Sequence, residues 1–115
     1  MFSNFRIPSL AALTLTALTT GVAAQDAWPT STVKVIVPYQ PGATADGLPR
    51  ILAEYLTQIW KQPVVLENRT GAGGNVGAEA AARAAPDGYT LLAATAGTHV
   101  TAVHLMKSLP YDPLR

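Results

Sequence analysis

The sequence predicts an α/β fold in which parallel strands alternate with helices, as in a sheet built from βαβ units. Short runs of β-branched and other apolar residues recur along the chain, and between them lie stretches whose apolar residues repeat at helical spacing. Such alternation is typical of a parallel sheet with helices on both faces. Apolar residues make up 49% of the 115 residues, which is enough for a packed core.

The first 24 residues predict a cleavable export signal. Met1–Arg6 carries one positive charge, and residues 7–22 carry none. Val22 and Ala24 place small side chains at positions −3 and −1 of a cut, so we expect cleavage after Ala24 and a periplasmic mature protein. A permanent membrane anchor is the alternative. The apolar run of about 16 residues is interrupted by four threonines, whereas a membrane span needs about 20 apolar residues.

The first half of the mature chain predicts one strand, one loop and one helix. A β-branched run predicts a strand at 33–37, and a loop of small residues follows at 39–45. Pro49 lacks an N–H group and fits a helix only in its first turn, so we expect the helix to begin near Asp46–Leu48 and to end near Lys61. The apolar stripe of this helix consists of Leu48, Ile51, Leu52, Tyr55, Leu56, Ile59 and Trp60.

The second half repeats the pattern of strand and helix. In chain order it predicts a strand at 63–67, a glycine-rich loop at 71–77, a helix at 78–85, a strand at 89–94, a small-residue loop at 95–98 and a short helix at 100–106.

Composition excludes several classes of function. Eight Lys and Arg residues against seven Asp and Glu residues, without a basic cluster, argue against nucleic-acid binding. The absence of cysteine excludes disulfides, thiolate metal sites and cysteine nucleophiles. His99 and His104 are five residues apart and do not share a helix face, so we expect no metal site.

The loops that follow the predicted strands are the expected binding site. In a parallel sheet, ligands bind beyond the carboxyl ends of the strands. The three loops there, Tyr39–Asp46, Asn68–Gly77 and Thr95–His99, are rich in Gly, Ala, Thr and Asn. Small side chains let a ligand approach the backbone, and each following helix begins with unpaired N–H groups. The pattern predicts a site for a small anion that needs neither Lys nor Arg.

The glycine-rich loop has two alternative interpretations besides anion binding. A dinucleotide-binding fingerprint that starts from Gly71 and Gly73 requires glycine at position 76, where Val76 stands. A Walker loop requires a Gly-Lys pair, which the sequence lacks. These departures disfavour a nucleotide cofactor. A tight strand-to-helix turn that uses positive φ remains an alternative.

Polar side chains near these loops each have two possible roles. Asp46 could contact a ligand or could cap the helix that follows it. Arg50 and Arg69 could bind a carboxylate or could form surface ion pairs, for example Arg69 with Glu67 or Asp87. His99 could donate one hydrogen bond to a ligand or could simply line its loop.

Six ordered segments resemble the periplasmic solute-binding receptors of tripartite tricarboxylate transporters, also called Bug-type receptors. The resemblance spans Trp28 to Arg115. The segments are Trp28–Pro29, Val35–Tyr39 with Pro41–Gly42, Gln62–Val65 with Glu67–Arg69, Gly71–Gly77, Ala85–Leu92 and Leu109–Pro113.

The resemblance implies a two-lobed Venus-flytrap fold, capture of a small carboxylate and delivery to the membrane components of a transporter, with neither a cofactor nor an enzymatic activity. It also implies that the ligand is held largely by main-chain amides and ordered waters. The residues that correspond to the family's site are Tyr39, Gly42, Ala43, Thr44, Asp46, Gly73, Gly74, Asn75, Thr95, Thr98 and His99. Ala43 departs from the family, which usually has glycine there.

Family members are much longer than this chain, so we expect residues 25–115 to represent an incomplete N-terminal lobe of a truncated receptor. Two alternatives stay open. One is an exported ligand sensor of the same fold that docks on a membrane kinase. The other is a small exported α/β enzyme, which is disfavoured because Ser31 and Ser108, the serines after the leader, do not lie in a Gly-x-Ser-x-Gly elbow.

Overall fold

The computed structural model describes residues 27–114, so the predicted signal peptide and its cleavage site lie outside the described residues. The three strands, β1 (Val33–Val37), β2 (Val64–Asn68) and β3 (Thr90–Leu92), form one sheet in the order β2-β1-β3. Both pairings are parallel, which confirms the predicted α/β class with a parallel sheet. Within the described part of the chain, no helix is long and apolar enough to cross a membrane.

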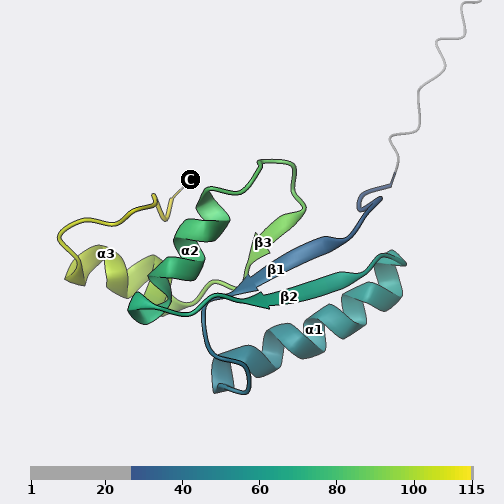
Figure 1. Cartoon of the computed structure of the whole chain (residues 1–115), viewed down its shortest axis with the longest axis horizontal. Coiled ribbons are helices and arrows are strands. Elements are labelled where there is room, and N and C mark those ends of the chain that lie inside the picture. The colour runs from purple at the N-terminus through teal and green to yellow at the C-terminus, as the bar shows by residue number, and fades with distance from the viewer. Residues whose placement is uncertain (1–26, 115) are drawn as a thin grey trace, which may run out of the picture.

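Helices cover the two faces of this sheet (Figure 1). α1 (Thr44–Trp60) joins β1 to β2 on one face, and α2 (Asn75–Ala82) joins β2 to β3 on the other. A short turn, η1 (Ala72–Gly74), precedes α2. After β3 come the π-helical turn η2 (Gly97–Thr101) and the short helix α3 (Ala102–Leu105).

The strand order places a topological switch point beside the central strand. From β1 the chain moves to β2 on one side, and from β2 it crosses to β3 on the other side of β1. The loops after β1 and β3 therefore lead to different faces of the sheet, and the point where they part is where open parallel sheets bind ligands.

The core of the described residues is centred on β1. Val33 and Val37 are fully buried and Ile36 is 3% exposed. Alternate residues of a strand point to opposite faces, so Val33 and Val37 share one face and Ile36 occupies the other. Helix packing adds small side chains to this core, with Ala53 from α1 and Ala78 from α2 both buried.

The apolar stripe of α1 is mostly exposed. Leu48, Ile51, Leu52, Tyr55 and Ile59 keep between 50% and 74% of their surface. Asp46 and Ala53 are instead the buried residues of the helix, so the side of α1 that touches the sheet is rotated away from the stripe.

Two helices begin earlier than predicted. α1 begins at Thr44 rather than at Asp46–Leu48, which places Pro49 at its sixth position. Asp46 secures this first turn, because its carboxylate accepts a hydrogen bond from the Gly42 N–H, and its own N–H donates to the Ala43 carbonyl. The missing N–H of Pro49 therefore does not delay the start of the helix.

α2 begins at Asn75, three residues before the predicted start at 78. Gly77, in the first turn of α2, packs so closely against the residues after β1 and β2 that a Cβ there would lie 2.8 Å from the Arg69 carbonyl and 2.8 Å from Pro38 Cβ. The predicted loop at 95–98 is also partly helical, because η2 begins at Gly97, and β3 is shorter than the predicted 89–94.

Candidate functional site

The three loops predicted to form a site meet at the carboxyl edge of the sheet. Tyr39, directly after β1, reaches the loop after β3, where its Oη lies 2.7 Å from Thr95 Oγ1. The same hydroxyl lies against two glycines, since a Cβ built at Gly74 or Gly97 would be 3.4 Å or 3.3 Å from it. Tyr39 therefore joins the β1 loop to both other loops.

The glycine-rich loop is a tight turn between β2 and α2. Gly71, Gly73 and Gly74 have φ values of 135°, 68° and 100°. This backbone region disfavours residues that carry a Cβ. The turn brings Gly74 against Thr98 of η2, where a Cβ would lie 3.0 Å from Thr98 Cγ2. The alternative of a strand-to-helix turn that uses positive φ is thus confirmed, and the turn also builds the site.

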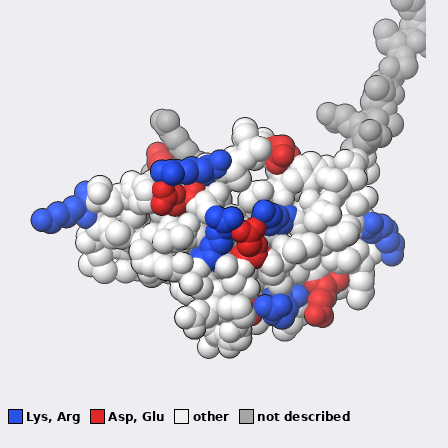
Figure 2. Space-filling model, viewed as in Figure 1, with Lys and Arg blue, Asp and Glu red and all other residues white. Residues whose placement is uncertain are grey.

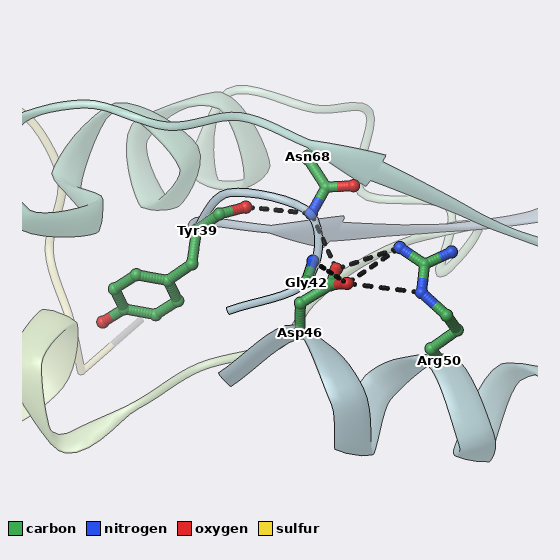
Figure 3. A network of polar contacts seen from close by, with 5 residues as sticks. All are labelled: Tyr39, Gly42, Asp46, Arg50 and Asn68. Carbon is green, nitrogen blue, oxygen red and sulfur yellow. Dashed lines mark hydrogen bonds and ion pairs between the residues drawn. The ribbon is translucent and has the colours of Figure 1, made fainter. Parts of the chain in front are cut away.

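A polar network anchors the β1 loop to α1 and to the end of β2 (Figure 3). Asp46 Oδ2 accepts a hydrogen bond of 3.0 Å from the Gly42 N–H, and Arg50 Nη2 donates to the same oxygen at 2.9 Å. Asn68 Nδ2 donates to Asp46 Oδ1 at 2.8 Å and to the Tyr39 carbonyl at 2.9 Å. One carboxylate therefore ties three segments together.

This environment fixes the charge of Asp46. Hydrogen bonds from the Asn68 side chain, the Gly42 N–H and Arg50 hold the pKa of Asp46 at about 2, below its usual value of 3.8. The carboxylate is only 1% exposed and stays ionised at neutral pH. Asp46 is not the residue that caps α1, because Ala43 holds that position, extended at φ −66°. Positive φ falls instead on Gly42, at 81°.

Both arginines near the loops form ion pairs with neighbouring carboxylates. Arg50 pairs with Asp46, and Arg69 pairs with Glu67, as the surface-pair alternative predicts. Lys34 also contacts Glu67, with Nζ and Oε2 2.8 Å apart. These two cations lower the pKa of Glu67, Lys34 having the larger effect. Figure 2 shows acidic and basic side chains side by side on this face rather than a patch of one sign.

The eleven candidate residues divide by exposure. Gly42, Thr44 and Gly73 are exposed; Tyr39, Ala43, Thr95 and His99 are half-buried; Asp46, Gly74, Asn75 and Thr98 are buried. The side chains of Asp46, Asn75 and Thr98 form hydrogen bonds within the protein. Thr98 Oγ1, for example, donates to the Thr95 carbonyl at 3.0 Å and lies 2.9 Å from His99 Nδ1.

Sequence reasoning missed Asn68, which links Asp46 to the Tyr39 carbonyl. Asn68 is the last residue of β2 and pairs in register with Val37, the last residue of β1. The signal in the sequence is a polar residue at the end of a predicted strand. The contact between Asn68 and Asp46 cannot be predicted from it, because it depends on the register in which β2 pairs with β1. Tyr111 was also missed as a site residue, although its motif was noted.

The start of α1, at the carboxyl edge of the sheet, has backbone N–H groups without an acceptor inside the helix. The Thr44 and Ala45 N–H groups lie in the first turn, where no carbonyl four residues back belongs to the helix. Two other amides at the site already have acceptors: the Gly74 N–H donates to the Gly71 carbonyl, and the Thr98 N–H donates to the Thr95 carbonyl. An anion at this edge would therefore be met chiefly by the first turn of the longest helix.

Two surface hollows lie beside the sheet. One, of about 470 Å³, is lined by Lys34, Glu67 and Arg69 with residues of α2, and the other, of about 590 Å³, lies between α1 and β2. Both hollows lie on faces of the sheet rather than at its carboxyl edge. Ligands of open parallel sheets bind at that edge, so the loops there form the candidate site.

Known proteins resemble the chain over most of its length. Residues 48–115 match the family model of the tripartite tricarboxylate transporter family receptor. Protein BugT of Bordetella pertussis is 40% identical over 109 residues, which are 91% of this chain and 33% of BugT. The chain thus spans about a third of that relative's length.

Two solved structures are also similar. R. palustris Rpa4515 with adipate has a TM-score of 0.73 at 38% identity, over 76% of this chain and 29% of that one. MatC (Rpa3494) from Rhodopseudomonas palustris with bound malate has a TM-score of 0.70 at 41% identity, over 74% of this chain and 29% of that one. The fold is thus that of this type of binding protein.

Proposed function

The chain belongs to the tripartite tricarboxylate transporter receptor family, and from this membership we propose that it captures a small carboxylate solute in the periplasm for a transporter of that kind. The observation that carries the proposal is the meeting of three small-residue loops at the carboxyl edge of the sheet, joined by the contact between Tyr39 and Thr95. Adipate and malate, which the two similar proteins bind, support a dicarboxylate as ligand.

The mechanism follows from the first turn of α1. The Thr44 and Ala45 amides point away from the helix body, and the dipole of a 17-residue helix adds a partial positive charge at that end. Such an end stabilises an exposed anion by about 0.3–1 kcal/mol, and more where it is partly buried. The negative charge of Asp46 would oppose an anion. Arg50 compensates for it, because its guanidinium donates to both carboxylate oxygens.

The role of the other candidates is to hold the loops. The buried side chains of Asp46, Asn75 and Thr98 act on a ligand through the backbone that they fix. Tyr39, Thr95 and His99 are half-buried at the carboxyl edge of the sheet, and Gly42, Thr44 and Gly73 are exposed there. Water-mediated contacts complete the shell around a small carboxylate. No bond of the ligand is broken, so the protein is a receptor rather than an enzyme.

The remaining parts of the proposal concern location and partners. We propose that residues 1–24 are removed on export and that residues 25–115 form part of the N-terminal lobe of a two-lobed receptor. The membrane components of the transporter are the proposed partners. A sensor that docks on a membrane kinase would have the same ligand site, and a pull-down with each membrane partner separates the two.

Isothermal titration of the complete gene product tests the proposal. We expect malate, adipate or a tricarboxylate to bind with one site per molecule, and we expect the matched dimethyl esters to give no heat, because they lack the charge that the first turn of α1 stabilises. A folded protein that binds none of the acids, or binds an ester equally well, would contradict the proposal.

A further inference from the structure

The segment that follows α3 turns back toward α2, as Figure 1 shows. It brings Tyr111 between two of the loops at the site. The Tyr111 hydroxyl lies 2.8 Å from Asn75 Oδ1 and 2.6 Å from the Thr98 carbonyl oxygen, and its single proton is shared between these two acceptors. Asn75 begins α2 directly after the glycine-rich turn, and Thr98 lies in η2 after β3. One hydroxyl therefore contacts both the glycine-rich turn and the loop after β3.

These contacts complete a chain of hydrogen bonds across the whole site. From the β1 loop, Tyr39 Oη meets Thr95 Oγ1, and the Thr95 N–H in turn donates to Thr98 Oγ1 at 3.2 Å. Tyr111 joins Thr98 to Asn75, whose Nδ2 donates to the Ala72 carbonyl at 2.8 Å. The β1, β3 and glycine-rich loops are connected, and Tyr111 is the member that comes from outside them.

We propose that Tyr111 is a positioning residue for carboxylate binding, because its hydroxyl fixes the glycine-rich turn to η2. The inference rests on the proposed function and extends it to a residue that does not touch the ligand. If the turn and η2 move independently, only a fraction of the free protein has the binding arrangement, and the apparent affinity falls by that fraction.

The surroundings of Tyr111 suit this role. Burial, and then the nearby Tyr39, raises the pKa of Tyr111 above its usual value of 10.0, so the hydroxyl remains a donor throughout the physiological range. Both of its partners are oxygen acceptors, and the side chain of Asn75 is itself 6% exposed. Water can therefore replace the hydroxyl only by entering the packed contact between the two loops.

Tyr111→Phe tests the proposal, and Tyr89→Phe is the matched control. Tyr89 loses a hydroxyl that contacts the N–H and Oγ1 of Thr30, both at 3.0 Å, far from the loops. In the complete gene product, we expect Tyr111→Phe to weaken malate or adipate binding about fivefold, as the loss of one ordinary hydrogen bond does. Amide hydrogen exchange of residues 72–75 and 97–99 should accelerate without ligand. Tyr89→Phe should change neither quantity.

A second variant guards against a general loss of folding. Asn75→Ala and Tyr111→Phe remove opposite partners of one bond, so their effects on affinity should be less than additive when combined. Equal affinity for Tyr111→Phe and Tyr89→Phe would overturn the proposal, as would faster exchange with unchanged affinity. Absence of carboxylate binding by the unsubstituted protein would overturn the proposed function, and the exchange comparison would still decide whether Tyr111 holds the loops.

Discussion

Replacement of Gly74 by valine should lower the affinity for a carboxylate at least about tenfold, or about 1.4 kcal/mol. Gly74 has φ +100°, where a β-branched residue is strained. Its Cβ would lie 3.0 Å from Thr98 Cγ2 and 3.3 Å from Pro38 Cβ, and the two further methyl groups of valine need more space still. The glycine-rich turn would move away from η2, and the site would lose the arrangement of its loops.

Two control variants separate binding from stability. Gly88 also has positive φ, at 80°, but lies near Trp28 and away from the loops of the candidate site. Gly88→Val should therefore reduce thermal stability without a comparable loss of affinity. Arg69→Ala removes an exposed ion pair with Glu67 and should change affinity less than about threefold. If isothermal titration shows that Arg69→Ala abolishes binding while Gly74→Val has no effect, the site is a side-chain clamp.

Replacement of Asp46 by asparagine should have a comparably large effect. Both Asp46 oxygens accept hydrogen bonds, from the Gly42 N–H, Arg50 and Asn68. An asparagine side chain must turn its NH₂ group toward one set of these donors, which leaves a donor facing a donor and Arg50 without its counter-ion. We expect the β1 loop to lose its anchor and carboxylate affinity to fall at least about tenfold.

The pH dependence of unfolding gives a second readout for Asp46. Its pKa is about 2 in the folded protein against a usual value of 3.8, so the folded state favours the ionised form. The stabilisation is fully present above about pH 4 and is lost as the pH falls toward 2. Thermal unfolding should thus show a large gap between the unsubstituted protein and Asp46→Asn at neutral pH. The gap should narrow as the pH approaches 2.

Glu54→Gln is the matched control for this series, because it removes one negative charge from an exposed position of the same helix. It should change neither affinity nor the shape of the pH curve. If Glu54→Gln and Asp46→Asn behave alike at every pH, the Asp46 network does not anchor the loop.

Local patterns in the sequence predict the elements of this fold well. The run of β-branched residues locates β1 at its observed bounds, Val33–Val37, and the apolar spacing locates the body of α1. Helix starts are predicted less well because side-chain and packing contacts that the apolar spacing does not reveal occur there. Asp46 reaches back to Gly42 at the start of α1, and Gly77 packs on Pro38 and the Arg69 carbonyl near the start of α2.

The candidate site is predictable to the level of its loops. Small residues after each strand identify them, because parallel strands end at one edge. Which side chains face a ligand is not predictable in this way. Asp46 has its partner Asn68 only because β2 pairs with β1 in one register, and Asn75 meets Tyr111 only because the chain returns after α3.

Backbone amide chemical shifts during a malate titration test the central claim most directly, because the claim concerns main-chain N–H groups at one edge of the sheet. In the ¹⁵N-labelled complete gene product, the largest changes within the part of the chain described here should occur at Thr44, Ala45 and Gly73, while the amides around Arg83 should not change. The opposite result, in which changes centre on the hollow lined by Lys34, Arg69 and Arg83, would contradict it.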